Sequence, residues 1–325
     1  MPRIIRALSA LLTVLVIGFA VGACGSDDES SSSDKSSSSS SGGAGLIKKD
    51  SANAGKSVIV GSKNFDEQFI LGEIYAQTLE AAGFKVKKQL NLGSEQIAYK
   101  ALKGDQINAY PEYSGTALSN FYDVKTDDIP ADPQESYDQL KADAEKDGVT
   151  ALPQTPFQNT FVVTSTKAEN KKLGGAKTIS DLAKQGSKIS ISGFPECRQR
   201  TDCLLGLKNK YGWTPKFVSS QGKYDDLDQG QADLTFGFGT DGQLATDKYY
   251  TYEDDKKLFP PYYISFLVNK EGIAALGQSG QDVIAKVQEP LTEQVMQELN
   301  SRVSLDKQKP EKVAHDYLKA AGFIK

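Results

Sequence analysis

Apolar and polar residues alternate along this chain in two periods, from about residue 57 onwards. Short apolar runs bounded by turn residues predict strands, and apolar residues at helical spacing predict helices. In the first predicted helix, Phe69, Ile70, Ile74 and Leu79 share one face, and Gly83 ends it. The pattern predicts strands at 57–61, 84–90 and 107–110, helices over 66–82 and 94–103, and a short helix from Ser114. Strands that alternate with helices in this way predict a mostly parallel sheet covered by helices.

The pattern changes character twice further along the chain. A helix over 134–147 is followed by Pro153 and Pro156, and a new apolar run begins at Phe161. A second proline-marked run, from Phe259 to Tyr263, returns to the first pattern. Between them we expect helices at 178–185 and 201–211 and strands at 188–193, 215–218 and 233–237; after them, helices over 279–299 and 310–321. We interpret the two proline-marked segments as places where the chain crosses between two lobes. They predict an α/β clamshell in which residues 56–157 and 262–325 form lobe 1 and residues 158–261 form lobe 2.

The chain begins with the features of an export signal. Residues 1–23 contain two arginines, then an apolar run and small residues, which is typical of a secretory signal peptide. Val21-Gly22-Ala23-Cys24 resembles a bacterial lipobox, although leucine is more usual at the position of Val21. The resemblance implies lipidation of Cys24 and a location at the outer face of the cell membrane. An unlipidated export signal followed by a chance cysteine is the alternative.

Residues 24–55 are predicted to link this anchor to the folded part, which we expect to begin near Lys56. The first part of the segment is mostly serine, glycine and acidic residues, and such a composition buries too little apolar surface to fold. A flexible leash keeps a binding protein at high local concentration beside a membrane partner. A low-complexity insert without function predicts the same disorder.

Composition narrows the classes of function. With 38% hydrophobic and 25% charged residues, the 325-residue chain has a globular composition and enough length for two lobes. The net charge is −4, without the basic stripe that nucleic-acid binding requires. The one histidine, His315, lies in a C-terminal helical pattern and is expected to be exposed, which weakens enzyme interpretations. No metal site or cofactor is expected, and we expect a monomer.

Two turns contain the residues that are the first candidates for ligand binding. In the first, residues 107–118, Pro111 is predicted to end a strand and Gly115 to allow the turn into a helix, with Tyr113 and Thr116 on one face. In the second, the strand 58–60 leaves through Gly61-Ser62-Lys63 into a helix. Such turns at the carboxyl ends of strands bind ligands in α/β proteins. A surface turn with a half-buried tyrosine is the alternative for the first.

Together these turns resemble the substrate-binding proteins of ABC importers for glycine betaine, choline and related osmoprotectants. Pro111-Glu112-Tyr113-Ser114-Gly115-Thr116 is the most specific part of a resemblance that covers about residues 57–325. It implies a two-lobed periplasmic-binding-protein fold of type II, with the ligand between the lobes and an ABC permease as the membrane partner.

A quaternary ammonium group has no N–H to donate, so proteins hold it between aromatic faces. The resemblance implies a cage of four aromatic residues, Tyr113, Phe161, Phe238 and Tyr262. Phe161 and Phe238 replace tyrosines of the family, and Asn159 stands at an acidic position. These departures affect which ligand binds and how tightly. For each aromatic taken alone, core packing is the alternative.

The carboxylate of a betaine needs basic or hydroxyl donors at the other end. The resemblance implies Lys63, Thr116 and Arg200, with Arg200 chosen over Arg198 by its spacing to Asp202. Cys197 and Cys203 flank this arginine, and in an exported protein two close cysteines are expected to form a disulfide.

Three functions remain open at this point. The first is a lipid-anchored receptor that delivers a solute such as glycine betaine to an ABC permease. A secreted enzyme on the same scaffold would need a nucleophile and base or a metal cluster, and the carboxylates of Asp225 and Asp226 lie in a polar loop. A ligand sensor without transport is the third. The sequence does not rank glycine betaine, proline betaine, carnitine, choline or another cationic or aromatic solute.

Overall fold

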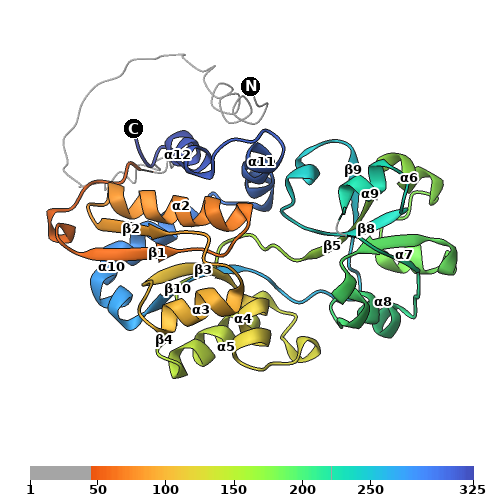
Figure 1. Ribbon diagram of the computed structural model, residues 1–325, viewed down its shortest axis with the longest axis horizontal. Coiled ribbons are helices and arrows are strands. Elements are labelled where there is room, and N and C mark those ends of the chain that lie inside the picture. The colour runs from red at the N-terminus through yellow and green to blue at the C-terminus, as the bar shows by residue number, and fades with distance from the viewer. Residues whose placement is uncertain (1–44, 221) are drawn as a thin grey trace, which may run out of the picture. The chain divides into compact units, whose positions relative to one another are not determined.

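The computed structural model describes residues 45–220 and 222–325, which contain two separate five-stranded sheets. Figure 1 shows the first sheet among the segments coloured red to yellow and blue, and the second among those coloured green to cyan. We call the parts built on them lobe 1 and lobe 2. Lobe 1 thus combines an early and a late part of the chain, as the two predicted crossings require.

The sheet of lobe 1 has the order β2-β1-β3-β10-β4. Its strands are β1 (Ser57–Gly61), β2 (Lys85–Gln89), β3 (Ala109–Tyr113), β4 (Val149–Ala151) and β10 (Ile264–Asn269). The helices are α2 (Asp66–Ala81), α3 (Glu95–Lys103), α4 (Ser114–Phe121), α5 (Pro133–Lys146), α10 (Lys270–Gln288), α11 (Glu293–Ser304) and α12 (Pro310–Ala320). β10 runs antiparallel to its neighbours β3 and β4, so the sheet is mixed.

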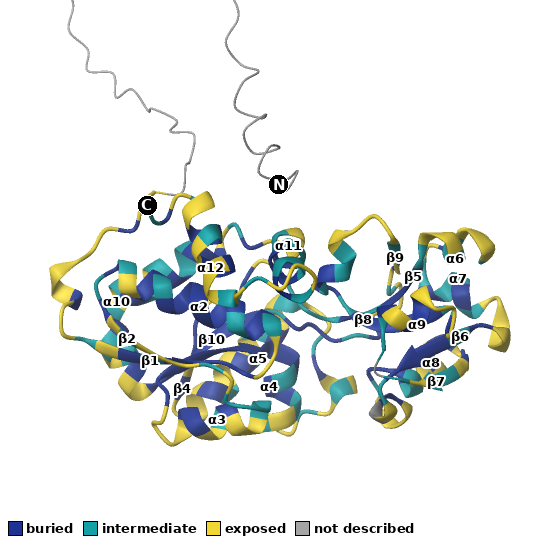
Figure 2. Cartoon of the chain, turned by 45° about the horizontal axis from the view of Figure 1, so that its top comes forward, coloured by how far each residue is buried: buried dark blue, intermediate teal, exposed yellow. Residues whose placement is uncertain are grey.

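The sheet of lobe 2 has the order β7-β6-β8-β5-β9 and is also mixed. Its strands are β5 (Phe161–Thr166), β6 (Ser190–Gly193), β7 (Lys216–Ser219), β8 (Leu234–Phe238) and β9 (Tyr249–Tyr252). The helices are α6 (Lys167–Lys172), α7 (Ile179–Ala183), α8 (Leu204–Tyr211) and α9 (Tyr224–Asp228). In Figure 2 the central strands of both sheets are largely buried, whereas edge strands such as β2 and the outer helices carry exposed residues. Each lobe therefore has its own core.

The prediction that Pro111 ends a strand is wrong. β3 continues through Pro111 to Tyr113, and all five of its residues are buried. Backbone hydrogen bonds join Asn269 to Asn108 and Ser114 to Tyr263, so the alternating pattern turns the nitrogen of Pro111 away from β10. On the other side β1 pairs with β3 only at Ala109. The missing N–H of Pro111 therefore costs no ladder hydrogen bond.

Two other expectations also differ from the structure. The single helix predicted over 279–299 is two helices, α10 and α11, separated by a break at Pro290, which cannot continue a helix. The ordered chain also begins before Lys56. The Ile47 N–H donates to Phe323, the Asp50 N–H donates to Ala82, and Ile47 is buried against lobe 1.

Within the described residues, we found no helix that is both long enough and apolar enough to span a membrane. The predicted signal peptide, Cys24 and the serine-rich segment lie outside the described residues.

Candidate ligand site between the lobes

A cavity of about 1140 Å³ lies between residues of the two lobes. All eight residues predicted to contact a ligand line this cavity: Lys63, Tyr113, Thr116, Asn159, Phe161, Arg200, Phe238 and Tyr262. In the sequence they extend from residue 63 to residue 262, and the two crossings between the lobes lie within this range. The fold therefore brings the whole predicted set to one place.

Lobe 1 positions its site residues at the carboxyl ends of adjacent strands. Lys63 follows the end of β1, Tyr113 is the last residue of β3, and Thr116 lies in the first turn of α4. The Gln68 side chain accepts a hydrogen bond from the Lys63 N–H at 3.0 Å, which fixes the turn from β1 into α2. Parallel strands that share an edge thus bring residues 50 positions apart together.

Lobe 2 supplies a cluster of phenylalanines. Phe161 on β5 lies opposite Phe238 on β8 in the register of the sheet, and their ring centroids are 4.8 Å apart. Phe194, which the sequence analysis did not select, stacks on Phe161 at 6.1 Å and also lines the cavity. Tyr113 and Tyr262 face the cavity from lobe 1 and the returning crossing. Aromatic faces are therefore available from both lobes.

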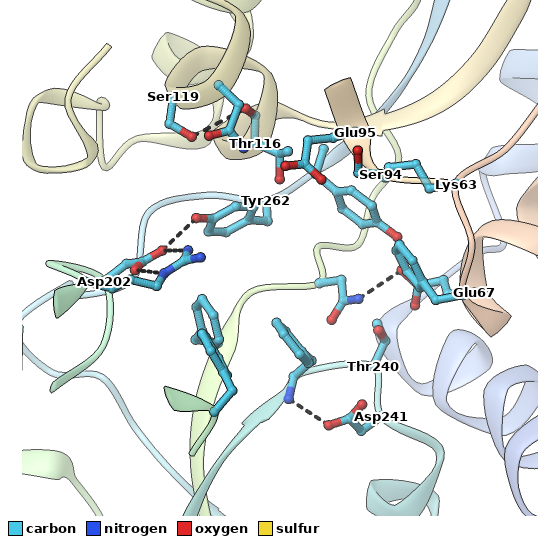
Figure 3. A pocket seen from close by; sticks show the side chains of 18 of the residues that line it. Lys63, Glu67, Ser94, Glu95, Thr116, Ser119, Asp202, Thr240, Asp241 and Tyr262 are labelled. Atoms are coloured by element: carbon cyan, nitrogen blue, oxygen red, sulfur yellow. Dashed lines mark hydrogen bonds and ion pairs between the residues drawn. The ribbon is translucent and has the colours of Figure 1, made fainter. Parts of the chain in front are cut away.

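Arg200 is held in place by a carboxylate. Its Nε donates to Asp202 at 2.7 Å and its terminal nitrogen donates to the other oxygen, a two-pronged ion pair. The Tyr262 hydroxyl donates to the same Asp202 at 3.1 Å, as Figure 3 shows. The guanidinium lies 5.4 Å from the centre of the Phe161 ring, and the Arg200 side chain is 43% exposed. Asp202 orients Arg200 and leaves part of its fork open to the cavity.

Lys63, which is predicted to donate to the carboxylate of the ligand, already has an ion-pair partner in lobe 1. Its ammonium group forms an ion pair with the fully buried Glu112 and lies 4.5 Å from the centre of the Tyr113 ring. Glu112 also accepts from the Tyr110 hydroxyl at 3.0 Å. Glu112 therefore compensates the charge of Lys63 within lobe 1. The Lys63 ammonium group also stabilises the Tyr113 ring by a cation–π contact.

Glu67 is a cavity residue that the sequence analysis missed. It lies in the first turn of α2 and is 3% exposed. Its carboxylate accepts from the Tyr113 hydroxyl at 2.7 Å, from Asn159 Nδ2 at 3.1 Å and from Asn300 Nδ2 at 2.9 Å. Burial raises the pKa of Glu67, and these hydrogen bonds act in the opposite direction. The signal in the sequence that could have identified Glu67 is its position in the first helical turn after Lys63.

Cys197 and Cys203 form a disulfide with their Cα atoms 5.3 Å apart, and both are buried. The bridge encloses Arg200 in a short loop. Within the described residues no group of histidine, cysteine, aspartate or glutamate has the arrangement to hold a metal ion.

Comparison with known proteins agrees with this geometry. Residues 56–320 match the family model described as the substrate-binding domain of ABC-type glycine betaine transport systems. The chain is 31% identical to the glycine-betaine-binding protein of Pseudomonas aeruginosa, covering 85% of this chain and 91% of that protein. It is 26% identical to the ergothioneine transport permease and binding protein of Helicobacter pylori, covering 82% of this chain and 48% of that one.

Among solved structures, a glycine betaine/carnitine/choline ABC transporter crystal structure superposes with a TM-score of 0.73. The two sequences are 26% identical, and the match covers 81% of this chain and 97% of the other. This likeness confirms the α/β fold of two lobes and type II that the resemblance implied. Members of the matched family are transport binding proteins, not enzymes. The chain belongs to the family of substrate-binding domains of ABC-type glycine betaine transport systems.

Proposed function

We propose that this chain is a lipid-anchored receptor at the outer face of the cell membrane that binds a quaternary-ammonium osmoprotectant such as glycine betaine. The ligand lies between the lobes and is delivered to an ABC permease. The observation that carries this proposal is that eight residues selected from sequence line one cavity, with aromatic faces from both lobes. Family membership supports the transport role.

The ammonium group of the ligand binds among Tyr113, Phe161, Phe238 and Tyr262. Phenylalanine retains the negative face that attracts a cation, so two phenylalanines in place of tyrosines keep the attraction and lose two hydroxyl groups. The carboxylate binds to Arg200 and Thr116. The guanidinium of Arg200 is oriented by Asp202 and partly open, which supports this role. Lys63, paired with Glu112, contributes through its position beside Tyr113.

Calorimetric titration of the purified protein with glycine betaine, proline betaine, carnitine and choline tests the proposal. Ergothioneine, which the Helicobacter pylori relative binds according to its name, is a fifth ligand. We expect a betaine to bind, and the Tyr113→Ala and Arg200→Ala variants to lose that binding. Choline binding that survives Arg200→Ala would retain the cage and reject the carboxylate assignment. Absence of binding to every betaine and to choline would contradict the proposal.

The anchor is tested separately. Expression in bacteria with radiolabelled palmitate should label the wild-type protein and not the Cys24→Ser variant, because lipid is attached to the cysteine. An unlabelled wild-type protein that is released into the medium would contradict the anchor and leave the ligand assignment intact.

A further inference from the structure

Among the described residues that line the cavity, three cationic side chains lie beside carboxylates. Lys63 pairs with Glu112, Arg200 pairs with Asp202, and Lys223 Nζ lies 3.5 Å from Asp241. Asp202 is buried, and its charge is compensated by Arg200. These three cations are therefore compensated within the protein.

Two buried acidic residues, Asp202 and Glu67, line the described part of the cavity, and Glu67 is the one without an ion-pair partner. It is buried, and the groups that donate to it are the neutral side chains of Tyr113, Asn159 and Asn300. None of the described ion pairs includes Glu67. A buried carboxylate without a counter-charge is costly, since hydrogen bonds from neutral groups replace only part of its lost hydration.

The position of Glu67 matches one end of a zwitterionic ligand. Its carboxylate is hydrogen-bonded to the hydroxyl of Tyr113, an aromatic residue of the proposed cage. In Figure 3, Glu67 and Thr240 lie on one side of the cavity and Asp202 and Tyr262 on the other. Arg200, bound to Asp202, belongs to that second side. The Glu67 carboxyl group thus lies on the side of the cavity opposite the Arg200 guanidinium.

Glu67 is also held firmly. Asn300 on α11 donates to Glu67 and, at 2.7 Å, to the backbone oxygen of Thr240 in lobe 2. Asn159 approaches from the crossing between the lobes, and Tyr113 from β3. Three other parts of the chain therefore fix this carboxylate in one orientation, which a pre-organised electrostatic contact requires.

We propose that Glu67 is a specificity-determining residue whose carboxylate is the counter-charge for the ammonium group of the ligand. This rests on the proposed function and adds a formal charge to the aromatic cage. Aromatic faces alone attract a cation modestly, whereas a buried carboxylate strongly favours a cation over a neutral group of equal shape. Glu67 accordingly lets the site reject ligands that fit sterically and lack the positive charge.

The test compares glycine betaine with 3,3-dimethylbutanoate, in which carbon replaces the ammonium nitrogen. Shape and carboxylate are the same, so the ratio of the two dissociation constants isolates the positive charge. We measure this ratio by calorimetry, with competition for weak ligands, in the wild-type protein and in Glu67→Gln. Asp66→Asn is the matched control, because it removes one acid from the adjacent position of the same helix turn. Thermal melting verifies that each variant is folded.

We expect the wild-type protein to prefer glycine betaine and the preference to fall by about tenfold or more in Glu67→Gln. Asp66→Asn should change it much less. An unchanged preference in Glu67→Gln, or an equal fall in Asp66→Asn, overturns the proposal while the proposed function stands. A wild-type protein that binds neither compound overturns both. If Glu67→Gln does not fold, Glu67→Asp is measured instead. This variant keeps the negative charge, so we expect it to keep the preference for glycine betaine. Loss of the preference in Glu67→Asp would overturn the proposal.

Discussion

Arg200 shows how one side chain depends on its immediate neighbours. Asp202 accepts hydrogen bonds from two nitrogens of the guanidinium, whose central carbon lies 5.4 and 5.7 Å from the ring centres of Phe161 and Phe194. Planar stacking and a two-pronged contact are properties of arginine that lysine lacks. The role proposed for this residue therefore depends on its shape as well as its charge.

The Arg200→Lys substitution is expected to weaken betaine binding by about tenfold or more, because a point charge cannot keep both contacts with Asp202. Titration of the purified variant with glycine betaine measures the loss. Arg198→Lys is the control, since Arg198 is exposed and lies over Phe217 away from the cavity. Equal losses in both variants would contradict a specific role for Arg200.

Glu67 should also affect stability in a pH-dependent way. Burial raises its pKa above the ordinary value of 4.5, so the folded protein holds this proton more tightly than the unfolded chain does. The stability contributed by the protonated group is complete below pH 4.5 and is lost as the pH rises through the folded-state pKa. The tyrosines that face it, Tyr113 and Tyr75, have pKa values raised above their usual range and stay protonated.

The ligand-free wild-type protein should therefore lose stability relative to Glu67→Gln as the pH rises above 4.5. Denaturant titrations of both proteins at several pH values measure the difference in free energy of unfolding. A difference that stays constant over this range would show that Glu67 has the same pKa in the folded and unfolded states.

At the level of elements, the start of α4 packs closely against the chain that returns from lobe 2. A Cβ atom on Gly115 would lie 2.8 Å from the Pro261 oxygen and 2.9 Å from the Tyr262 ring. Ser114 is tied to the same segment, since its hydroxyl donates to Pro261 at 3.0 Å. Gly115 thus allows the helix to approach close enough to set the position of Tyr262.

We expect Gly115→Ala to displace Tyr262, to reduce stability by about 1–3 kcal/mol and to weaken betaine binding. Chemical denaturation and calorimetric titration of one preparation separate the two effects. If affinity is unchanged while stability falls, the position of Tyr262 does not matter for the ligand.

For the whole molecule, the contact between α11 and the loop 239–245 joins the lobes beside the cavity. Gln297 Nε2 donates to the Gly239 oxygen and Asn300 Nδ2 donates to the Thr240 oxygen, both at 2.7 Å. A Cβ atom on Gly242 would lie 2.6 Å from the backbone nitrogen and Cα of Ser301. This contact therefore requires glycine at position 242.

The Gly242→Ala substitution should push this loop away from α11 and weaken ligand binding. The added methyl group would contact the backbone of α11, which can shift only at a high cost in packing energy. Calorimetric titration measures the affinity, and small-angle scattering with and without betaine measures the change in size on binding. Gly239→Ala is the control from the same loop, since its Cβ would have ordinary contacts at 3.6 Å or more. Wild-type affinity in Gly242→Ala would show that binding does not need this contact.

Local patterns in the sequence determined the fold class, the two crossings and the ligand-facing turns. Alternating strand and helix periods, proline-marked crossings and the Pro111–Thr116 motif depend on neighbouring residues and are visible without a structure. The same locality explains the errors. Whether Pro111 ends a strand depends on which partner strand its nitrogen faces, and β10 lies more than 150 positions later.

Only the tertiary structure decided how the charges of the site are distributed. Sequence identifies Lys63 and Arg200 as bases, yet their pairing with Glu112 and Asp202 depends on distances between side chains. Glu67 becomes a candidate for the same reason, because its burial and its contacts with Tyr113, Asn159 and Asn300 involve three other parts of the chain. Charge compensation is a property of the folded neighbourhood, since electrostatic energies depend on distance and burial rather than on order in the chain.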